Sequence, residues 1–259
     1  MQLMKGMMEV FLQLCVLLLV AAAESSHRKE YTDVAVIFTQ QWPMTFCLEK
    51  HAHQEPCVIP DNVTFWTIHG LWPKNGEFCN ASWPFNETKI KELVPLLKLY
   101  WPDLKGHGSE FWKYEWDKHG TCAGSLPEMN SEFKYFNKAL ELHHNQNLLK
   151  ILSNMGIVPS LKNTYKFADI EMAFHKAFGV KPKVQCIKEK DQKQMLGQIE
   201  VCLNKSLLPI ACEHSSTQAK SQSSNSNSTQ KLIYLMTSPF HLCSNALPVV
   251  YPPISMRMP

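Results

Sequence analysis

Two histidines of this 259-residue chain, His69 and His119, lie in short segments that are rich in polar and aromatic side chains. His69 follows an apolar, β-branched stretch, so we expect it at the end of a strand, facing a cleft. Glu115 and Lys118 come shortly before His119, at spacings that would place all three side chains on one face of a helix. Two imidazoles can act as general base and general acid in one displacement, and a neighbouring ammonium stabilises negative charge that develops on phosphate.

Such a site would suit cleavage of RNA, because the 2′-hydroxyl group of RNA supplies the nucleophile and no metal is then required. The indole of Trp72, close to His69 in sequence, is a candidate to stack an unpaired base. The alternative is structural: Glu115, Lys118 and His119 would form a solvated helix face, and the neighbouring tryptophans would belong to the core. The residue types alone leave both interpretations open.

The elements that must position these side chains are predicted from the spacing of apolar residues. Apolar and β-branched runs predict strands at residues 34–38, 63–69, 184–187, 197–203 and 232–236. Helical spacing predicts helices at residues 88–100, 109–119, 128–153 (with a break around 145–147) and 167–178. Strands and helices mix without regular alternation, which favours an α+β fold over a parallel α/β sheet.

The composition is that of a folded protein, with 45% hydrophobic residues and a formal charge of only +3, which neither requires nor excludes a polyanionic partner. Residues 1–23 combine a basic start, a short apolar run and terminal alanines, as in a secretory signal cleaved near 23/24. That run is too short for a membrane anchor. We expect residues 24–259 to form one domain, because the polar stretch 215–230 has cysteines on both sides and is predicted to be a loop.

The cysteines and sequons agree with a secretory route. Cys15 lies in the signal, and the remaining even number predicts four disulfides among Cys47, Cys57, Cys79, Cys122, Cys186, Cys202, Cys212 and Cys243. Five Asn-x-Ser/Thr sequons are candidate glycosylation sites, at Asn62, Asn80, Asn86, Asn204 and Asn227. No Cys-x-x-Cys pair and no cluster of acidic ligands is evident, so we expect neither a metal ion nor a cofactor.

Two composite motifs carry a resemblance to a known family: His69-Gly70-Leu71-Trp72-Pro73 and Glu115-Trp116-Asp117-Lys118-His119-Gly120-Thr121-Cys122. In order and spacing they resemble the two active-site segments of the ribonuclease T2 family, and the similarity extends over about residues 31–253. The resemblance implies a central antiparallel β-sheet flanked by helices. It further implies an endoribonuclease that acts on single-stranded RNA without a metal, in RNA catabolism. We expect it to work best at mildly acidic pH, where one imidazole can be charged while the other stays neutral. The expected products are 2′,3′-cyclic phosphate and 5′-hydroxyl ends, and the expected location is the lysosome lumen or outside the cell.

The resemblance also implies roles for individual residues. His119 resembles the general base and His69 the general acid, while Glu115 and Lys118 resemble the groups that stabilise the phosphate transition state. Tyr114 stands where many relatives have a phosphate-binding histidine, and we expect Tyr114 and Trp72 to contact substrate. Lys74 replaces an aspartate that helps relatives to select a base, so the base preference of the family is not carried over to this chain.

The disulfide pairing implied by the resemblance is Cys47–Cys57, Cys79–Cys122, Cys186–Cys243 and Cys202–Cys212. The second bridge would fix the distance between the two histidines. We expect a monomer with single-stranded RNA as its partner. An alternative is an extracellular binding or signalling protein that keeps the ribonuclease fold, but such a protein has no physical reason to retain His69, Glu115, Lys118 and His119 together.

Overall fold

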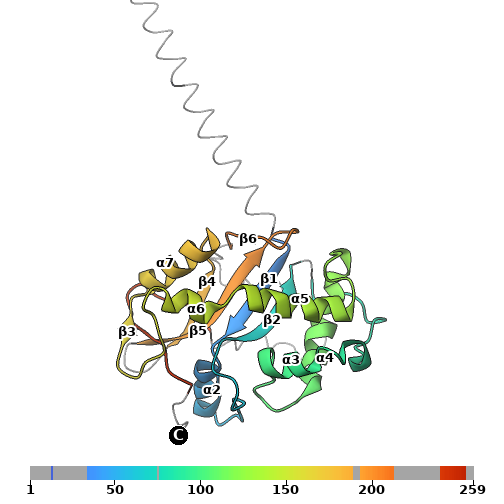
Figure 1. Cartoon of the computed structure of the whole chain (residues 1–259), viewed down its shortest axis with the longest axis horizontal. Coiled ribbons are helices and arrows are strands. Elements are labelled where there is room, and N and C mark those ends of the chain that lie inside the picture. Colours follow the sequence, from blue (N-terminus) through green and yellow to red (C-terminus); the bar gives the residue numbers. More distant parts are fainter. Residues whose placement is uncertain (1–12, 14–33, 75, 189–192, 213–239, 255–259) are drawn as a thin grey trace, which may run out of the picture.

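The computed structural model describes residues 13, 34–74, 76–188, 193–212 and 240–254. At its centre is a β-sheet with the strand order β2-β1-β5-β4-β7 (Figure 1), in which all of these neighbours are antiparallel. The strands of this path are β1 (Val36–Gln41), β2 (Thr67–Pro73), β4 (Lys183–Lys188), β5 (Gln194–Leu203) and β7 (His241–Leu242). Three short strands complete the sheet: β3 (Thr164–Tyr165), β6 (Pro209–Ile210) and β8 (Val249–Val250), of which β8 pairs in parallel with β5.

Helices α5, α6 and α7 lie over the sheet in the view of Figure 1, with α3 and α4 beside its β2 edge and α2 at one end of the strands. Their bounds are α2 (Pro43–Ala52), α3 (Val94–Tyr100), α4 (Ser109–Lys118), α5 (Glu132–Asn145), α6 (Leu148–Ser153) and α7 (Phe167–Phe178). Two 3₁₀ helices, η1 (Glu87–Ile90) and η2 (Gly120–Ser125), stand before α3 and directly after α4. The predicted α+β class, with an antiparallel sheet flanked by helices, is confirmed.

Several predicted boundaries are confirmed. Helix α7 has the predicted bounds, and Gly179 ends it in a left-handed conformation with φ of 74°. The predicted break between two helices is present, because α5 ends at Asn145 and the Asn147 side chain caps α6 by accepting from the Lys150 N–H. The predicted strand 232–236, the polar loop 215–230 and the signal 1–23 lie outside the described residues.

Two predictions about elements were wrong, and one helix was not predicted. Residues 63–66 are not in a strand: the Val63 N–H bonds to Pro60 O in a turn, and β2 begins only at Thr67. The continuous helix 88–100 is divided into η1 and α3, because Pro95 in the first turn of α3 has no N–H and starts a new helix there. Helix α2 was not predicted, since Trp42-Pro43 marked the end of a strand and not the start of a helix.

In the core, tryptophans from before β2 pack against Tyr251 and Pro252, which follow β8. Trp42, Trp66 and Tyr251 are buried with their rings in contact, and the Trp66 Nε1–H donates to the Tyr251 hydroxyl at 2.8 Å. The Trp42 Nε1–H donates to Pro252 O at 2.7 Å. Within the described part of the chain, no helix has the length and apolar character that crossing a membrane requires.

The structure contains four disulfides, Cys47–Cys57, Cys79–Cys122, Cys186–Cys243 and Cys202–Cys212. This is the pairing that the family resemblance implies. The bridge from Cys79 to Cys122 connects the loop after β2 with η2, so it ties together the two segments that carry His69 and His119.

Candidate active site

His69 occupies a β-bulge in β2. Thr39 of β1 pairs with Gly70, and Gln40 pairs with Ile68, so His69 has no partner of its own on β1. A bulge turns the extra residue out of the regular alternation of side chains. Ile68 and Leu71 are therefore both fully buried in the core although they are three residues apart, while His69 is only partly buried.

The ring of His69 is oriented by a side chain from a strand that is not its neighbour. His69 Nδ1 lies 2.5 Å from Gln198 Oε1, and the Gln198 amide nitrogen donates to Gln185 Oε1 at 2.6 Å and to Glu200 Oε1 at 3.3 Å. Because Gln198 offers His69 an oxygen, Nδ1 must carry the hydrogen of this bond. Nε2 is then the nitrogen that gains or loses a proton.

The second histidine lies where α4 ends. The Ser109–Lys118 helix places Glu115 one turn before His119, and the His119 N–H bonds to Glu115 O at 3.0 Å. The chain continues into η2 without a loop, with the Cys122 N–H bonded to His119 O at 3.0 Å. Glu115 and His119 are 3% and 8% exposed, so both side chains are largely removed from water. The interpretation of Glu115, Lys118 and His119 as a solvated helix face was wrong.

The indole of Trp72 contacts both imidazoles. Its ring centre is 5.1 Å from that of His69 and 5.7 Å from that of His119, and its Nε1–H donates to Glu115 Oε2 at 3.3 Å. This packing requires glycine at position 70, since an added Cβ there would lie 2.6 Å from Trp72 Cε2 and 2.7 Å from Glu115 Oε2. The indole thus positions the polar groups of the site. Base stacking on its remaining surface stays a prediction.

Burial shifts the pKa values of His69, His119 and Glu115. It lowers the pKa of His69 to about 4, against the effect of the hydrogen bond to Gln198. It lowers the pKa of His119 to about 3, with further lowering by the positive charges of Lys118 and His69. It raises the pKa of the Glu115 carboxyl to about 8, although the Trp72 hydrogen bond and the Lys118 charge act in the opposite direction.

Lys118 and Tyr114 are in contact at the edge of the site. The Lys118 ammonium lies 5.4 Å from the centre of the Tyr114 ring and 3.4 Å from Glu77 Oε1. Tyr114 also meets the Phe78 ring at 6.4 Å between centres, and the Phe78 N–H bonds to Lys118 O at 2.8 Å. Lys74 stands at the end of β2, where its N–H bonds to Ala35 O at 2.9 Å.

Comparison with known proteins shows to which family this chain belongs. The sequence profile of the Ribonuclease T2 family matches residues 33–212. The chain belongs to the Ribonuclease T2 family. A ribonuclease T2 from Danio rerio is 41% identical over 239 residues, which cover 91% of this chain and 93% of the relative.

Solved structures of the family have the same fold. The crystal structure of human RNase T2 superposes with a TM-score of 0.67 at 38% identity, covering 85% of this chain and 98% of the human one. A variant of RNase MC1 in complex with 5′-UMP gives a TM-score of 0.59 at 26% identity, covering 70% of this chain and 92% of the other. The chain is therefore a ribonuclease T2-type endoribonuclease.

Sequence reasoning missed several residues of this ribonuclease T2 site. Gln198 lies in the segment 197–202, which contributed to the family resemblance, but a glutamine in a strand gives no sign of its own that it faces a histidine. Trp101, whose Nε1–H donates to His69 O at 3.0 Å, lies 32 residues after His69, and Glu77 lies far in sequence from Lys118, with which it pairs. Only the fold reveals these partners.

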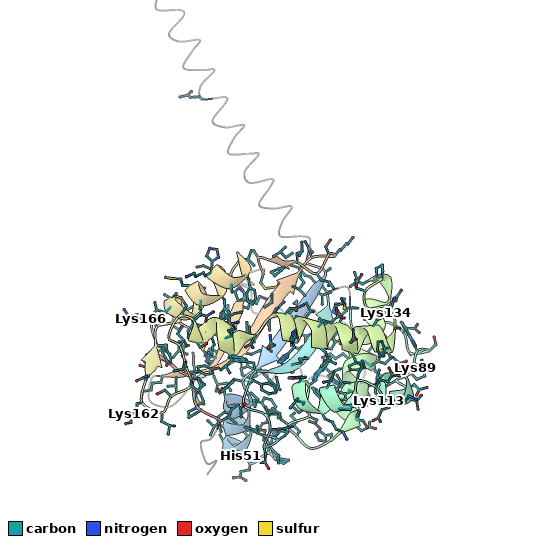
Figure 2. All side chains as sticks on the ribbon, viewed as in Figure 1. His51, Lys89, Lys113, Lys134, Lys162 and Lys166 are labelled. Atoms are coloured by element: carbon teal, nitrogen blue, oxygen red, sulfur yellow. A yellow bond between two sulfur atoms is a disulfide. The ribbon has the colours of Figure 1, made fainter. Side chains whose placement is uncertain are left out.

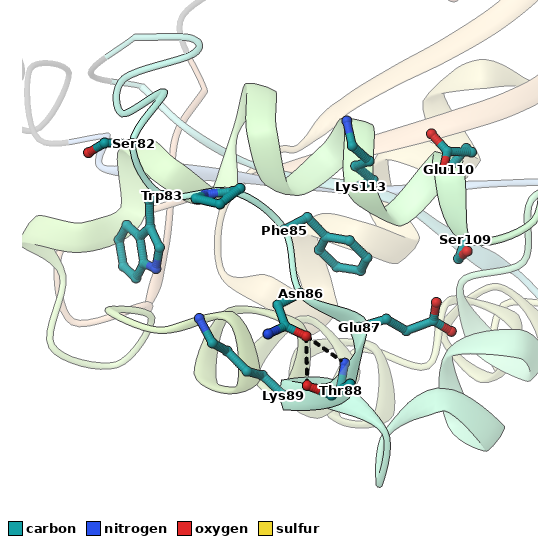
Figure 3. A pocket seen from close by; sticks show the side chains of 11 residues that line it. Ser82, Trp83, Phe85, Asn86, Glu87, Thr88, Lys89, Ser109, Glu110 and Lys113 are labelled. Carbon is teal, nitrogen blue, oxygen red and sulfur yellow. Dashed lines mark hydrogen bonds between the residues drawn. The ribbon is translucent and has the colours of Figure 1, made fainter.

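Most of the candidate glycosylation sites are found on turns. The Oδ1 atoms of Asn80, Asn86 and Asn204 each accept the backbone N–H of the residue two positions later. Asn86 also lines an open pocket of about 630 Å³, together with Trp83, Phe85 and residues of α4 (Figure 3), and no histidine is in its lining. Asn62 is exposed, and Asn227 lies outside the described residues.

No group of three or more histidine, cysteine, aspartate or glutamate side chains in the described part of the chain is arranged to hold a metal ion.

Proposed function

We propose that this ribonuclease cleaves single-stranded RNA by transphosphorylation between His69 and His119. His119 Nε2 or Nδ1 accepts the proton of the 2′-hydroxyl group, and the 2′-oxygen then bonds to the phosphorus atom. The bond from phosphorus to the 5′-oxygen breaks, and His69 Nε2 donates a proton to that oxygen. The products are a 2′,3′-cyclic phosphate and a 5′-hydroxyl group, so atoms and charges balance without a metal.

The observation that carries this proposal is that two imidazoles, His69 partly buried and His119 largely buried, both contact the ring of Trp72. The hydrogen bond to Gln198 supports the assignment of roles. It favours the protonated form of His69, whereas the pKa of His119 is lowered by the positive charges of Lys118 and His69 in addition to burial. We therefore assign the proton of the reactive state to His69, which acts as the acid, and leave His119 neutral as the base.

Glu115 and Lys118 are proposed to bind the phosphate oxygens that do not leave. With a pKa raised to about 8 by burial, the Glu115 carboxyl is protonated in acid and donates a hydrogen bond to such an oxygen. Lys118 adds a positive charge where the transition state becomes more negative. Tyr114 is proposed to hold the Lys118 ammonium over its ring, and Trp72 to contact the base.

The pH profile and the product ends test this proposal. We expect activity on a single-stranded oligoribonucleotide to peak in mild acid and to decline toward neutrality, because His69 loses its proton and Glu115 later loses its own. Bound phosphate, being negative, moves the histidine titrations upward from the values of the free protein. Rates measured from about pH 3 to pH 8 with excess EDTA, and product masses, provide the measurement. A maximum above neutrality, or loss of activity in EDTA, would contradict it.

An acidic optimum suits the lysosome lumen and RNA catabolism there. We propose that residues 1–23 direct the chain into the endoplasmic reticulum, and that residues 24–259 form a single monomeric domain that reaches the lysosome or is secreted. The four disulfides support passage through an oxidising compartment.

We propose that some of the five sequons, and not all of them, carry glycans. In Asn80, Asn86 and Asn204 the side-chain oxygen accepts the hydrogen bond that forms the turn. The turn does not use the side-chain nitrogen, which is the atom that bears the sugar. In protein secreted by animal cells, we expect an Asn→Gln change at Asn80, Asn86 or Asn204 to remove the mass of one glycan. Mass spectrometry of the intact protein before and after deglycosylation measures this. An unchanged glycan mass at any position would exclude that site.

A further inference from the structure

Glu200 belongs to a row of polar side chains that leads across the sheet to His69. Residues two apart on a strand face the same side, so Gln198 and Glu200 project from one face of β5. On β4, Lys183 pairs with Glu200 and Gln185 pairs with Gln198, and directly opposed residues share a face. The sheet therefore places four polar side chains together, and we call them the polar row: Lys183, Gln185, Gln198 and Glu200.

The polar row is largely closed to water. Gln198 is 3% exposed and Glu200 9%. Lys183 Nζ lies 3.9 Å from Glu200 Oε2, and only 17% of the lysine side chain is exposed. By contrast, Lys162 and Lys166 extend into solvent at the edge of the molecule (Figure 2). Burial raises the pKa of the Glu200 carboxyl, while the Lys183 charge and hydrogen bonds from both glutamines favour its ionised form. Because buried polar groups must satisfy one another, each hydrogen bond in the row constrains the next.

The Glu200 carboxylate fixes the direction of these hydrogen bonds. An ionised carboxylate only accepts, whereas a glutamine amide can present either its oxygen or its nitrogen. Glu200 Oε1 accepts from the Gln198 nitrogen at 3.3 Å, and Gln185 also donates to this carboxyl. Gln185 Oε1 accepts from the same Gln198 nitrogen at 2.6 Å. Because these two oxygens hold its nitrogen, Gln198 turns its oxygen to His69 Nδ1, at 2.5 Å.

We propose that Glu200 is a positioning residue that acts on His69 through Gln198. By holding the Gln198 amide in one orientation, the Glu200 carboxylate keeps the imidazole hydrogen on Nδ1. His69 Nε2 is then the nitrogen that delivers a proton to the leaving 5′-oxygen. This inference rests on the proposed function, in which His69 is the acid. Glu200 exerts its effect from two hydrogen bonds away, by keeping His69 in the tautomer that the reaction uses.

Glu200→Gln tests the proposal because it keeps the size of the side chain but can present a nitrogen to Gln198. The Gln198 amide can then turn over and donate to His69 Nδ1, which moves the imidazole hydrogen to Nε2 in a share of the molecules. NMR of the ring nitrogens at about pH 7.5, where both imidazoles are neutral, should show only the Nδ1–H form in the wild type and a mixture in Glu200→Gln. Glu141→Gln removes an exposed glutamate that pairs with Lys138 at 2.6 Å; as the matched control it should leave the His69 tautomer unchanged.

A double variant that exchanges the two side chains should restore the tautomer. Gln198→Glu combined with Glu200→Gln moves the carboxylate next to His69 and leaves an amide behind it. A carboxylate at position 198 accepts from Nδ1, so the double variant should return to the Nδ1–H form alone. Damage to the fold by Glu200→Gln would not be repaired by a second change in the same buried row.

Kinetics separate positioning from a structural role. On a single-stranded oligoribonucleotide, Glu200→Gln should lower kcat about fivefold, the scale of one hydrogen bond, with KM nearly unchanged. On a uridine nitrophenyl phosphate diester, whose leaving group needs no proton, kcat should stay within about twofold of the wild type. An unchanged tautomer, or equal losses on both substrates, would overturn the proposal. If the tautomers mix while the rate on the oligoribonucleotide stays that of the wild type, the acid role of His69 in the proposed function fails instead.

Discussion

Alanine in place of either His69 or His119 is expected to lower kcat on RNA by about 10³-fold, within the range that general acid–base catalysis contributes. Each variant retains the Glu115 and Lys118 groups that stabilise the phosphate, so a small residual rate should remain. Both histidines pack against Trp72, and circular dichroism with a thermal melt therefore accompanies the kinetics. His144→Ala, which removes an exposed histidine on α5, is the matched control and should leave kcat unchanged.

The two variants should differ on a substrate whose leaving group needs no proton. With a uridine 3′-(4-nitrophenyl phosphate) diester, His69→Ala should recover most of the lost rate, because nitrophenolate leaves without an acid. His119→Ala should remain slow on the same compound, since the 2′-hydroxyl group still requires a base. Recovery by His119→Ala alone would reverse the two roles, and recovery by neither would argue against separate acid and base residues.

Local spacing was sufficient to predict the part of the site that lies on one helix. Glu115 and His119 are one turn apart, and the Ser109–Lys118 helix forms where apolar spacing and its end signals indicated. The prediction that His69 comes from a strand was also correct, but the strand begins four residues later than expected and continues to Pro73. Family resemblance, and not spacing, linked the two segments into one site.

The orientation of His69 could not be predicted from the sequence, because it depends on pairing between distant strands. In a regular strand His69 would face the same side as Leu71, which is in the core. The bulge opposite Thr39 and Gln40 releases it from that pattern, and Gln198, 129 positions later in the chain, fixes its ring. Neither the bulge nor the partner has a local signal. The contacts of the Trp72 indole with both imidazoles likewise have no local signal in the sequence.

Replacement of Glu115 tests whether its carboxyl acts as a neutral hydrogen-bond donor. Glu115→Gln keeps a donor of the same shape, so we expect kcat in mild acid to fall about tenfold, whereas Glu115→Ala should lose about 10²-fold or more, as for removal of an oxyanion donor. Equal losses in the two variants would show that the carboxyl must itself exchange a proton or carry charge. Glu110→Gln, an exposed change on the same helix, is the control and should have no effect.

Glu115→Gln should lower activity but raise the free energy of unfolding at neutral pH. The pKa of Glu115 is raised to about 8 in the folded protein, above its ordinary value of 4.5, so its favourable contribution is complete below pH 4.5 and is lost as the pH rises toward 8. Glutamine never ionises. Glu115→Gln should therefore equal the wild type near pH 4.5 and exceed it at pH 7.5 by up to about 4 kcal/mol. Urea unfolding of both proteins at several pH values measures this difference.

His69 and His119 have lowered pKa values and contribute the opposite trend, since they lose stability as the pH falls below 6.5. Both are present in the wild type and in Glu115→Gln, so their effect cancels when the two proteins are compared at each pH. A stability difference that does not grow with pH would mean that Glu115 is ionised in the folded protein. The carboxyl could then not donate a hydrogen bond to the phosphate, and its role would have to be that of an anion.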